Sequence, residues 1–318
     1  MKNLNNETKG LFLGLVGVAI FSMTLPATRI AIGSFSPWFI SDGRVVGAGI
    51  LAALALIFTR QKFPNRRQIV QLYVIGLMIG LGFPFLATAA MSSLPASHGA
   101  ITLALQPLTT ALVAAFRAGE RPSFLFWAAS LTGSGAVIWY ALAQGGGSLE
   151  PADLMLLGAV AASGIGYAEG ARLSRELGSW QVISWVMVLI WPVLAIMMGF
   201  EIARTGTAPL FNAPLEAWLC VLYVAVLSQY IGFFAWYRGL AMGGVARVGQ
   251  LQLLQPFMTL VLSSFLLGEK ITLITALVAV VVVGAVAIGR KAPVALRQVT
   301  QTTPPIPCAS LEIAELQE

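Results

Sequence analysis

The sequence is poor in the side chains that build disulfide frameworks, metal centres and most catalytic sites. Its 318 residues include only two cysteines and one histidine. Cys220 lies in an apolar run and Cys308 near the C-terminus, so the cysteines have no disulfide-framework or paired metal-ligand spacing. A membrane enzyme would need a nucleophile, a base or metal ligands clustered at one depth, and the usual motifs for these are missing. We therefore expect no enzyme activity, no metal and no cofactor.

Charge is also scarce. Charged residues make up 10% of the chain and hydrophobic residues 58%, and the mean hydropathy is +0.83. Such a chain has too little polar surface to cover a soluble globule of this size. The net charge of +6 does not indicate nucleic-acid binding, because the cations lie at the ends of apolar segments. The composition predicts an integral membrane protein with lipid as its surroundings.

Ten apolar stretches are long enough to cross about 30 Å of hydrocarbon as helices. Helices are expected because backbone groups in lipid must be satisfied within the segment, and the short alternating pattern of a barrel strand is missing. The first stretch is too long for the apolar region of a signal peptide and is read as a span. The predicted spans are 10–30, 37–58, 69–93, 98–116, 122–142, 153–173, 178–200, 215–237, 246–267 and 271–289.

The cations are distributed unequally between the two sides of these spans. Fifteen of the nineteen lie on the same side as the N-terminus. The remaining four are Arg29, Arg44, Arg204 and Lys270. Because cytoplasmic loops carry the excess of lysine and arginine, we predict that both termini are cytoplasmic.

One phrase occurs twice in the chain. Residues 106–121 read QPLTTALVAAFRAGER, and residues 255–270, which begin 149 positions later, read QPFMTLVLSSFLLGEK. Apolar bias does not produce ordered Gln-Pro and Gly-Glu-cation pairs, so we infer an internal duplication. With five spans in each copy, the second copy must enter the membrane from the opposite face. Inverted repeats of this kind are typical of secondary transporters.

The predicted fold is thus an all-α integral membrane protein with ten transmembrane helices in two inverted five-helix repeats. The first repeat covers 1–143 and the second 153–290. A glycine-rich outer linker, 144–152, separates them, and a proline-rich C-terminal tail, 291–318, is expected to be disordered.

The repeated Gln-Pro pair has a possible role in binding. Pro107 and Pro256 cannot donate a backbone hydrogen bond, which leaves a carbonyl free beside the amides of Gln106 and Gln255. Such a position can bind a polar ligand at membrane depth. The alternative is a kink for packing, with the glutamine bonded to a neighbouring helix.

Further polar and aromatic side chains on the first, third and eighth spans complete a predicted substrate cavity. Uncharged amides, hydroxyls and freed carbonyls can hold an ammonium and a carboxylate without a fixed charge buried in the empty protein. An aromatic belt at the interface is the alternative for Trp236. The predicted cavity residues are Thr24, Phe83, Thr88, Gln106, Gln229, Tyr230, Phe233, Trp236 and Gln255.

Ionisable residues inside spans are candidates for gating or coupling, because burying them is costly. Asp42 and Arg44 form either a solvated pair near the outer interface or part of an outer gate. Glu169 can pair with Arg172 one helical turn away, and His98 is a candidate for proton coupling. The full set of gating or coupling candidates is Asp42, Arg44, His98, Pro107, Glu169 and Pro256.

Over roughly residues 10–290, the chain resembles the EamA-type branch of the drug/metabolite transporter superfamily, and within it the YddG subgroup of amino-acid exporters. The resemblance rests on the two Gln-Pro and Gly-Glu-cation phrases, on the first span GLVGVAIFSMTLPATRIAI, which has Phe21-Ser22 where the family has an aromatic-Gly pair, and on Arg44.

The resemblance implies a secondary transporter that exports amino acids or similar small amphipathic metabolites across the bacterial inner membrane by alternating access. An exporter of another metabolite or drug class, or a channel, is the alternative. The expected partners are a small-molecule substrate and membrane lipid, with no nucleic acid; the oligomeric state is not predicted.

Overall fold

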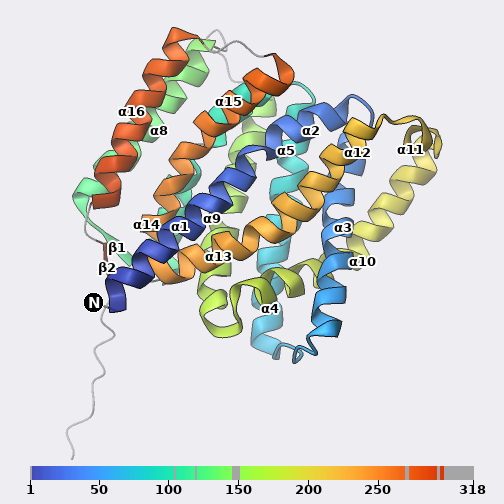
Figure 1. The fold of residues 1–318 in the computed structure, drawn as a ribbon, viewed down its shortest axis with the longest axis horizontal. Helices are drawn as coiled ribbons and strands as arrows, with labels where there is room; N and C mark the ends of the chain where they lie inside the picture. Colours follow the sequence, from blue (N-terminus) through green and yellow to red (C-terminus); the bar gives the residue numbers. More distant parts are fainter. Residues whose placement is uncertain are drawn as a thin grey trace, which may run out of the picture.

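The computed structural model describes residues 2–103, 105–118, 120–144, 151–268, 272–291 and 294–296. Within these ranges the chain is almost wholly helical (Figure 1). Seven helices among the described residues are long and apolar enough to cross a membrane. They are Asn6–Ile32, Pro37–Phe58, Arg66–Met91, Pro151–Leu177, Ser179–Thr205, Leu215–Gly243 and Val245–Leu267. Two shorter apolar helices, Gln106–Phe116 and Phe124–Tyr140, fall where two further spans are predicted.

The N-terminal part of the chain, up to Gln144, is predominantly helical and includes two π-helical segments, η1 between α4 and α5 and η2 after α7. Its elements are α1 (Lys2–Ser22), α2 (Thr24–Ile32), α3 (Pro37–Phe58), α4 (Arg66–Ile75), η1 (Gly76–Gly82), α5 (Phe83–Met91), α6 (Ala96–Leu103), α7 (Gln106–Val113), η2 (Ala114–Ala118), β1 (Glu120–Pro122) and α8 (Phe124–Gln144).

The C-terminal part, from Pro151, has a similar succession of helices. Here η3 is π-helical and η4 is a 3-10 helix. The elements are α9 (Pro151–Leu177), α10 (Ser179–Thr205), α11 (Ala208–Asn212), α12 (Leu215–Leu222), η3 (Tyr223–Ile231), α13 (Gly232–Gly243), α14 (Val245–Gly249), η4 (Gln250–Leu254), α15 (Gln255–Leu267), α16 (Leu273–Lys291) and β2 (Val294–Leu296).

The two short strands correct the expectation of a disordered tail at 294–296. β2 pairs with β1 in antiparallel register, with Glu120 opposite Leu296 and Pro122 opposite Val294. The backbone of the three residues thereby gains hydrogen-bond partners that an isolated tail lacks. The tail from 297 lies outside the described residues, as does the 145–150 part of the predicted linker 144–152. Pro151, which was assigned to that linker, already begins α9.

Helices from the two parts of the chain pack against each other in pairs. α1 packs on α13, α3 on α10, α8 on α16, and α9 on both α5 and α7. Figure 1 shows α8 and α16 side by side at one edge of the bundle. The largest apolar core includes Val45 of α3, Ala168 of α9, Ile183 of α10 and Trp236 of α13, all buried. It therefore lies among helices from both parts.

The contact between α1 and α13 depends on glycine. A Cβ added to Gly10 would lie 2.7 Å from the backbone nitrogen of Gly243, and one added to Gly239 would lie 2.8 Å from the carbonyl oxygen of Gly10. Gly14 lies against Gly239 in the same way. Small residues four apart, here Gly10 and Gly14 against Gly239 and Gly243, allow two helix backbones to approach closely in a membrane.

We predict that Gly239→Ala lowers the free energy of unfolding by about 1–3 kcal/mol, because the new methyl group meets backbone that cannot move aside. Gly199→Ala on α10 is the matched control, since a Cβ there has no neighbour within 4 Å. This control should be neutral or slightly stabilising because alanine is the better helix former. Thermal unfolding of both variants in detergent measures the difference, and equal midpoints would contradict the close contact.

Candidate functional site

Regular α-helix is interrupted at several positions among the described residues, and four of these interruptions adjoin one cavity. η1 and η3 are π-helical, and π-helical turns are frequent at functional sites. η1 leads directly into Phe83, and η3 contains Ser228 and Gln229. The third interruption is the 3-10 helix η4, which leads into Gln255. The fourth falls between α6 and α7, after Leu103.

The cavity that these interruptions adjoin is enclosed, and we call it the central cavity. It has about 10 Å³ of free space, room for roughly one water molecule. The central cavity is therefore closed, and a larger ligand requires the surrounding helices to move apart. It is lined by Phe21, Thr24, Arg44, Phe83, Leu103, Tyr167, Ser228, Gln229, Phe233 and Gln255.

Arg44 brings a positive charge into this cavity. Its side chain is buried, with the residue 2% exposed. One guanidinium nitrogen, Nη2, donates to Ser228 Oγ at 3.4 Å, while Nε is buried without a hydrogen-bond partner. The guanidinium carbon lies 6.0 Å from the centre of the Phe83 ring. Within the described part of the chain, no carboxylate forms an ion pair with Arg44.

Hydroxyl and amide groups from other helices complete the polar lining. Thr24 Oγ1 and Ser228 Oγ share a hydrogen bond of 2.8 Å. Gln229 donates from Nε2 to the carbonyl of Ile79 at 3.2 Å, but its Oε1 has no partner among the described residues. Gln255 Oε1 is likewise buried without a partner in the described structure. The cavity thus combines a cation, the aliphatic hydroxyls of Thr24 and Ser228 and two free amide acceptors.

Aromatic rings form the apolar wall. The Phe21 ring lies 5.1 Å from Phe233 and 6.4 Å from Tyr167, measured between ring centres. Trp236 supports this wall from behind, 5.5 Å from Tyr167, and does not itself line the cavity. The wall is therefore fixed by packing among α1, α9 and α13.

The structure places five of the nine predicted cavity residues on the cavity lining. These five are Thr24, Phe83, Gln229, Phe233 and Gln255. The other four lie elsewhere in the bundle: Thr88, Gln106, Tyr230 and Trp236.

Tyr230 and Gln106 do not line the cavity and form hydrogen bonds with side chains of neighbouring helices. The Tyr230 hydroxyl shares a 2.7 Å hydrogen bond with Ser184 Oγ. Gln106 donates to Ser163 Oγ at 2.8 Å and accepts from Gln252 Nε2 at 3.4 Å. For Gln106 the contacts match the packing alternative, whereas Gln255, its counterpart in the second Gln-Pro phrase, lines the cavity. Both prolines occupy the second position of a new helix, α7 or α15.

Four lining residues were not foreseen as a site from the sequence: Phe21, Leu103, Tyr167 and Ser228. Ser228 directly precedes Gln229, which was predicted as a cavity residue on the eighth span, so the prediction missed Ser228 by one position. Tyr167 lies between Gly166 and Gly170 on α9, where small residues leave room for neighbouring helices. Arg44, which we expected at a gate, also belongs to the lining, so the prediction of a cavity without a fixed charge is wrong.

Asp42 and Arg44 do not form the solvated pair considered from the sequence. Both are buried, at 1% and 2% exposure. Two residues of α-helix turn the side chain by about 200°, so the two side chains leave α3 on different faces. Asp42 faces a second, wider cavity of about 400 Å³. This cavity is lined by Trp38, Asp42, Phe85, Met197, Phe200, Glu201 and Arg204.

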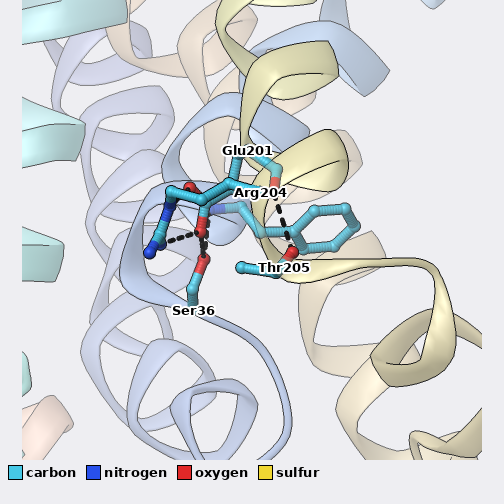
Figure 2. A network of polar contacts seen from close by, with 5 residues as sticks. Ser36, Glu201, Arg204 and Thr205 are labelled. Atoms are coloured by element: carbon cyan, nitrogen blue, oxygen red, sulfur yellow. Dashed lines mark hydrogen bonds and ion pairs between the residues drawn. The ribbon is translucent and has the colours of Figure 1, made fainter.

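A polar network holds the rim of the second cavity (Figure 2). Ser36 caps α3 and donates to Glu201 Oε1 at 2.5 Å. Arg204 donates to the same carboxylate from Nε at 3.1 Å and Nη2 at 3.0 Å, and Thr205 Oγ1 donates to the Glu201 carbonyl at 2.8 Å. Figure 2 shows the Glu201 carboxylate between Ser36 and Arg204. The network ties the start of α3 to the end of α10.

The remaining ionisable candidates are paired. Glu169 accepts from Arg172 at 2.7 and 3.2 Å, which confirms the predicted pairing. His98 Nε2 and Asp153 Oδ1 lie 2.7 Å apart and join α6 to α9. In the part of the chain that the structure describes, no three histidine, cysteine, aspartate or glutamate residues gather as a metal site.

Comparisons with known proteins agree with this architecture. The model of the EamA-like transporter family matches residues 8–142 and again 150–289. The uncharacterized transporter YdeK of Bacillus subtilis is 43% identical over 288 residues, which cover 91% of this chain and 99% of YdeK. A solved crystal structure superimposes with a TM-score of 0.66 at 19% identity, covering 88% of this chain and 97% of the other, and shows a shared fold.

Two more distant relatives have names that refer to amino acids. A probable amino-acid metabolite efflux pump of Escherichia coli is 25% identical, covering 82% of this chain and 87% of the relative. A probable terminal-alkyne amino-acid exporter of Streptantibioticus cattleyicolor is 24% identical, covering 82% and 86%. The double family match and the identity to YdeK over nearly their whole lengths lead to one conclusion. The chain is a membrane protein of the EamA-like transporter family.

Proposed function

We propose that this transporter exports amino acids or similar small amphipathic metabolites across the bacterial inner membrane by alternating access. The observation that carries the proposal is the closed central cavity, in which polar groups and aromatic rings from both parts of the chain meet. A zwitterion with an apolar side chain needs both kinds of contact. The names of the two amino-acid-related relatives support the same substrate class.

The proposed architecture is ten spans in two inverted repeats, 1–143 and 153–290. The family model matches each part separately, in agreement with a duplication. The helix pairs are also those expected if the two parts exchange places. That exchange turns the α1–α13 pair into the α9–α5 pair, and it leaves α3–α10 and α8–α16 unchanged. Two such halves can open a shared site to either side of the membrane in turn.

We predict that Gln255→Ala lowers amino-acid counterflow in proteoliposomes by about tenfold, the effect of losing one hydrogen bond to a charged group. The assay uses a panel of radiolabelled amino acids and is normalised to folded protein. Gln250→Ala is the matched control, since Gln250 is buried too but donates to Ser130 Oγ on α8, outside the cavity lining. Equal transport by the two variants would remove Gln255 from the site. If none of the amino acids moves, the substrate class is another metabolite or drug.

We also predict that both termini are cytoplasmic, because fifteen of nineteen cations lie on that side of the predicted spans. Figure 1 supports a shared side, with the start of the chain close to the β1–β2 pair. A fluorescent protein that matures only in the cytoplasm, fused to the C-terminus, should therefore fluoresce. The same reporter fused after Gln144, at the end of five predicted spans, should stay dark. The reverse pattern would overturn the orientation.

A further inference from the structure

The central cavity contains the positive charge of Arg44, which we had not predicted there from the sequence. This charge restricts the class of substrate that the cavity can bind. Resting on the proposed function, we propose that Arg44, with the hydroxyls of Ser228 and Thr24, forms a carboxylate subsite. Transported substrates then need a free carboxylate, and amines or esters of the same size are rejected.

The first argument is the state of the Arg44 charge. A buried charge is costly unless it is paired and hydrogen-bonded. Arg44 is almost fully buried, yet its hydrogen bond to Ser228 is long at 3.4 Å, and Nε has no partner in the described structure. The neighbouring acid on the same helix, Asp42, faces the other cavity. The guanidinium therefore lacks an anion, and the central cavity is where an anion can reach it.

The second argument is the geometry of the donors. Guanidinium is planar and presents paired N–H groups that match the two oxygens of a carboxylate. Thr24 and Ser228 share one hydrogen bond, which uses one of their two hydroxyl protons and leaves the other for a ligand. Arg44 comes from α3, Thr24 from α2 and Ser228 from η3. A bound carboxylate would join three separate segments of the bundle.

The rest of the cavity fits the remainder of an amino acid. The Oε1 atoms of Gln229 and Gln255 are acceptors without partners in the described structure, and an ammonium group supplies the donors they lack. Phe21, Tyr167 and Phe233 offer ring surface for an apolar side chain. The lining includes no carboxylate that could occupy Arg44 in place of the substrate. A zwitterion thus satisfies the cation and the acceptors together.

Competition against counterflow of a transported, radiolabelled amino acid tests the subsite. The competitors are the unlabelled amino acid, its methyl ester and the amine left by its decarboxylation. In the wild-type protein, the ester and the amine should inhibit at least tenfold more weakly than the amino acid, because each loses a charge-assisted hydrogen bond. Equal inhibition by all three competitors would overturn the subsite.

Substitutions at Arg44 test whether this residue is responsible for the preference for the amino acid over its ester. In Arg44→Gln the amino acid and its ester should become comparable competitors, while Arg44→Lys should keep part of the preference because it retains the charge. Ser228→Ala should weaken inhibition by the unlabelled amino acid by about threefold. Ser184→Ala is the matched control: its hydroxyl is equally buried but bonds Tyr230 outside the lining, so its selectivity should be that of the wild type. An Arg44→Gln protein that keeps the wild-type preference would contradict the proposal.

Ligand-dependent thermal stability of the wild-type protein provides a measurement that needs neither transport nor a folded Arg44 variant. The amino acid should raise the unfolding midpoint, and its methyl ester at the same concentration should not. If the panel shows no transport but carboxylate compounds alone stabilise the protein, the proposed amino-acid export fails and the carboxylate subsite stands. If esters and carboxylates stabilise equally, the subsite fails whatever the transport result.

Discussion

A polypeptide in lipid must satisfy its backbone hydrogen bonds within the protein, and the irregular parts of this molecule follow that constraint. The π-helical segments η1 and η3 and the 3-10 helix η4 lie against other helices inside the bundle. Residues in these segments or directly after them, Phe83, Ser228, Gln229 and Gln255, line the central cavity. At the break before α7, Leu105 N–H donates to the carbonyl of Thr102 at 3.1 Å, so the backbone finds a partner within the chain. The Gln106 side chain beside it is held by Ser163 and Gln252.

Much of the fold could be predicted from the chain, because it follows from local properties. Apolar length predicts the seven helices that, among the described residues, are long and apolar enough to cross a membrane. The repeated Gln-Pro phrase predicts a duplication, and the family match in two stretches supports it. The close approach of α1 and α13 also has a local signal, glycines four apart at Gly10 and Gly14 and at Gly239 and Gly243. The glycines alone do not show which helix packs against them, so the pairing of α1 with α13 could not be predicted from this signal. The pairing of β2 with β1 joins segments far apart in the chain and could not be predicted from composition.

The site was predicted less completely because helical phase changes within a span. Regular helical spacing puts Gln229, Phe233 and Trp236 on one face of the eighth span. The π-helical turns of η3 have a different angular step, and both Ser228 and Gln229 of η3 lie on the lining. Phe233 of the following helix α13 also lines the cavity, whereas Trp236 packs behind it against Tyr167. Arg44 was misplaced for a related reason. Arg44 lies two positions after Asp42 on α3, so the two side chains leave the helix on different faces. Asp42 faces the second cavity, and Arg44 lines the central cavity.

The unequal surroundings of the two Gln-Pro phrases have a consequence for the proposed cycle. Two identical halves would give the inward-open and outward-open forms equal free energies, and each would be half populated in the absence of substrate. Here the amide of Gln106 is engaged by Ser163 and Gln252, whereas Gln255 lines the cavity with a free acceptor. Exchanging the conformations of the halves therefore breaks and makes different hydrogen bonds in the two directions. In the proposed cycle the resting population would therefore be skewed toward one opening by the chain itself, before any gradient or ligand acts on it.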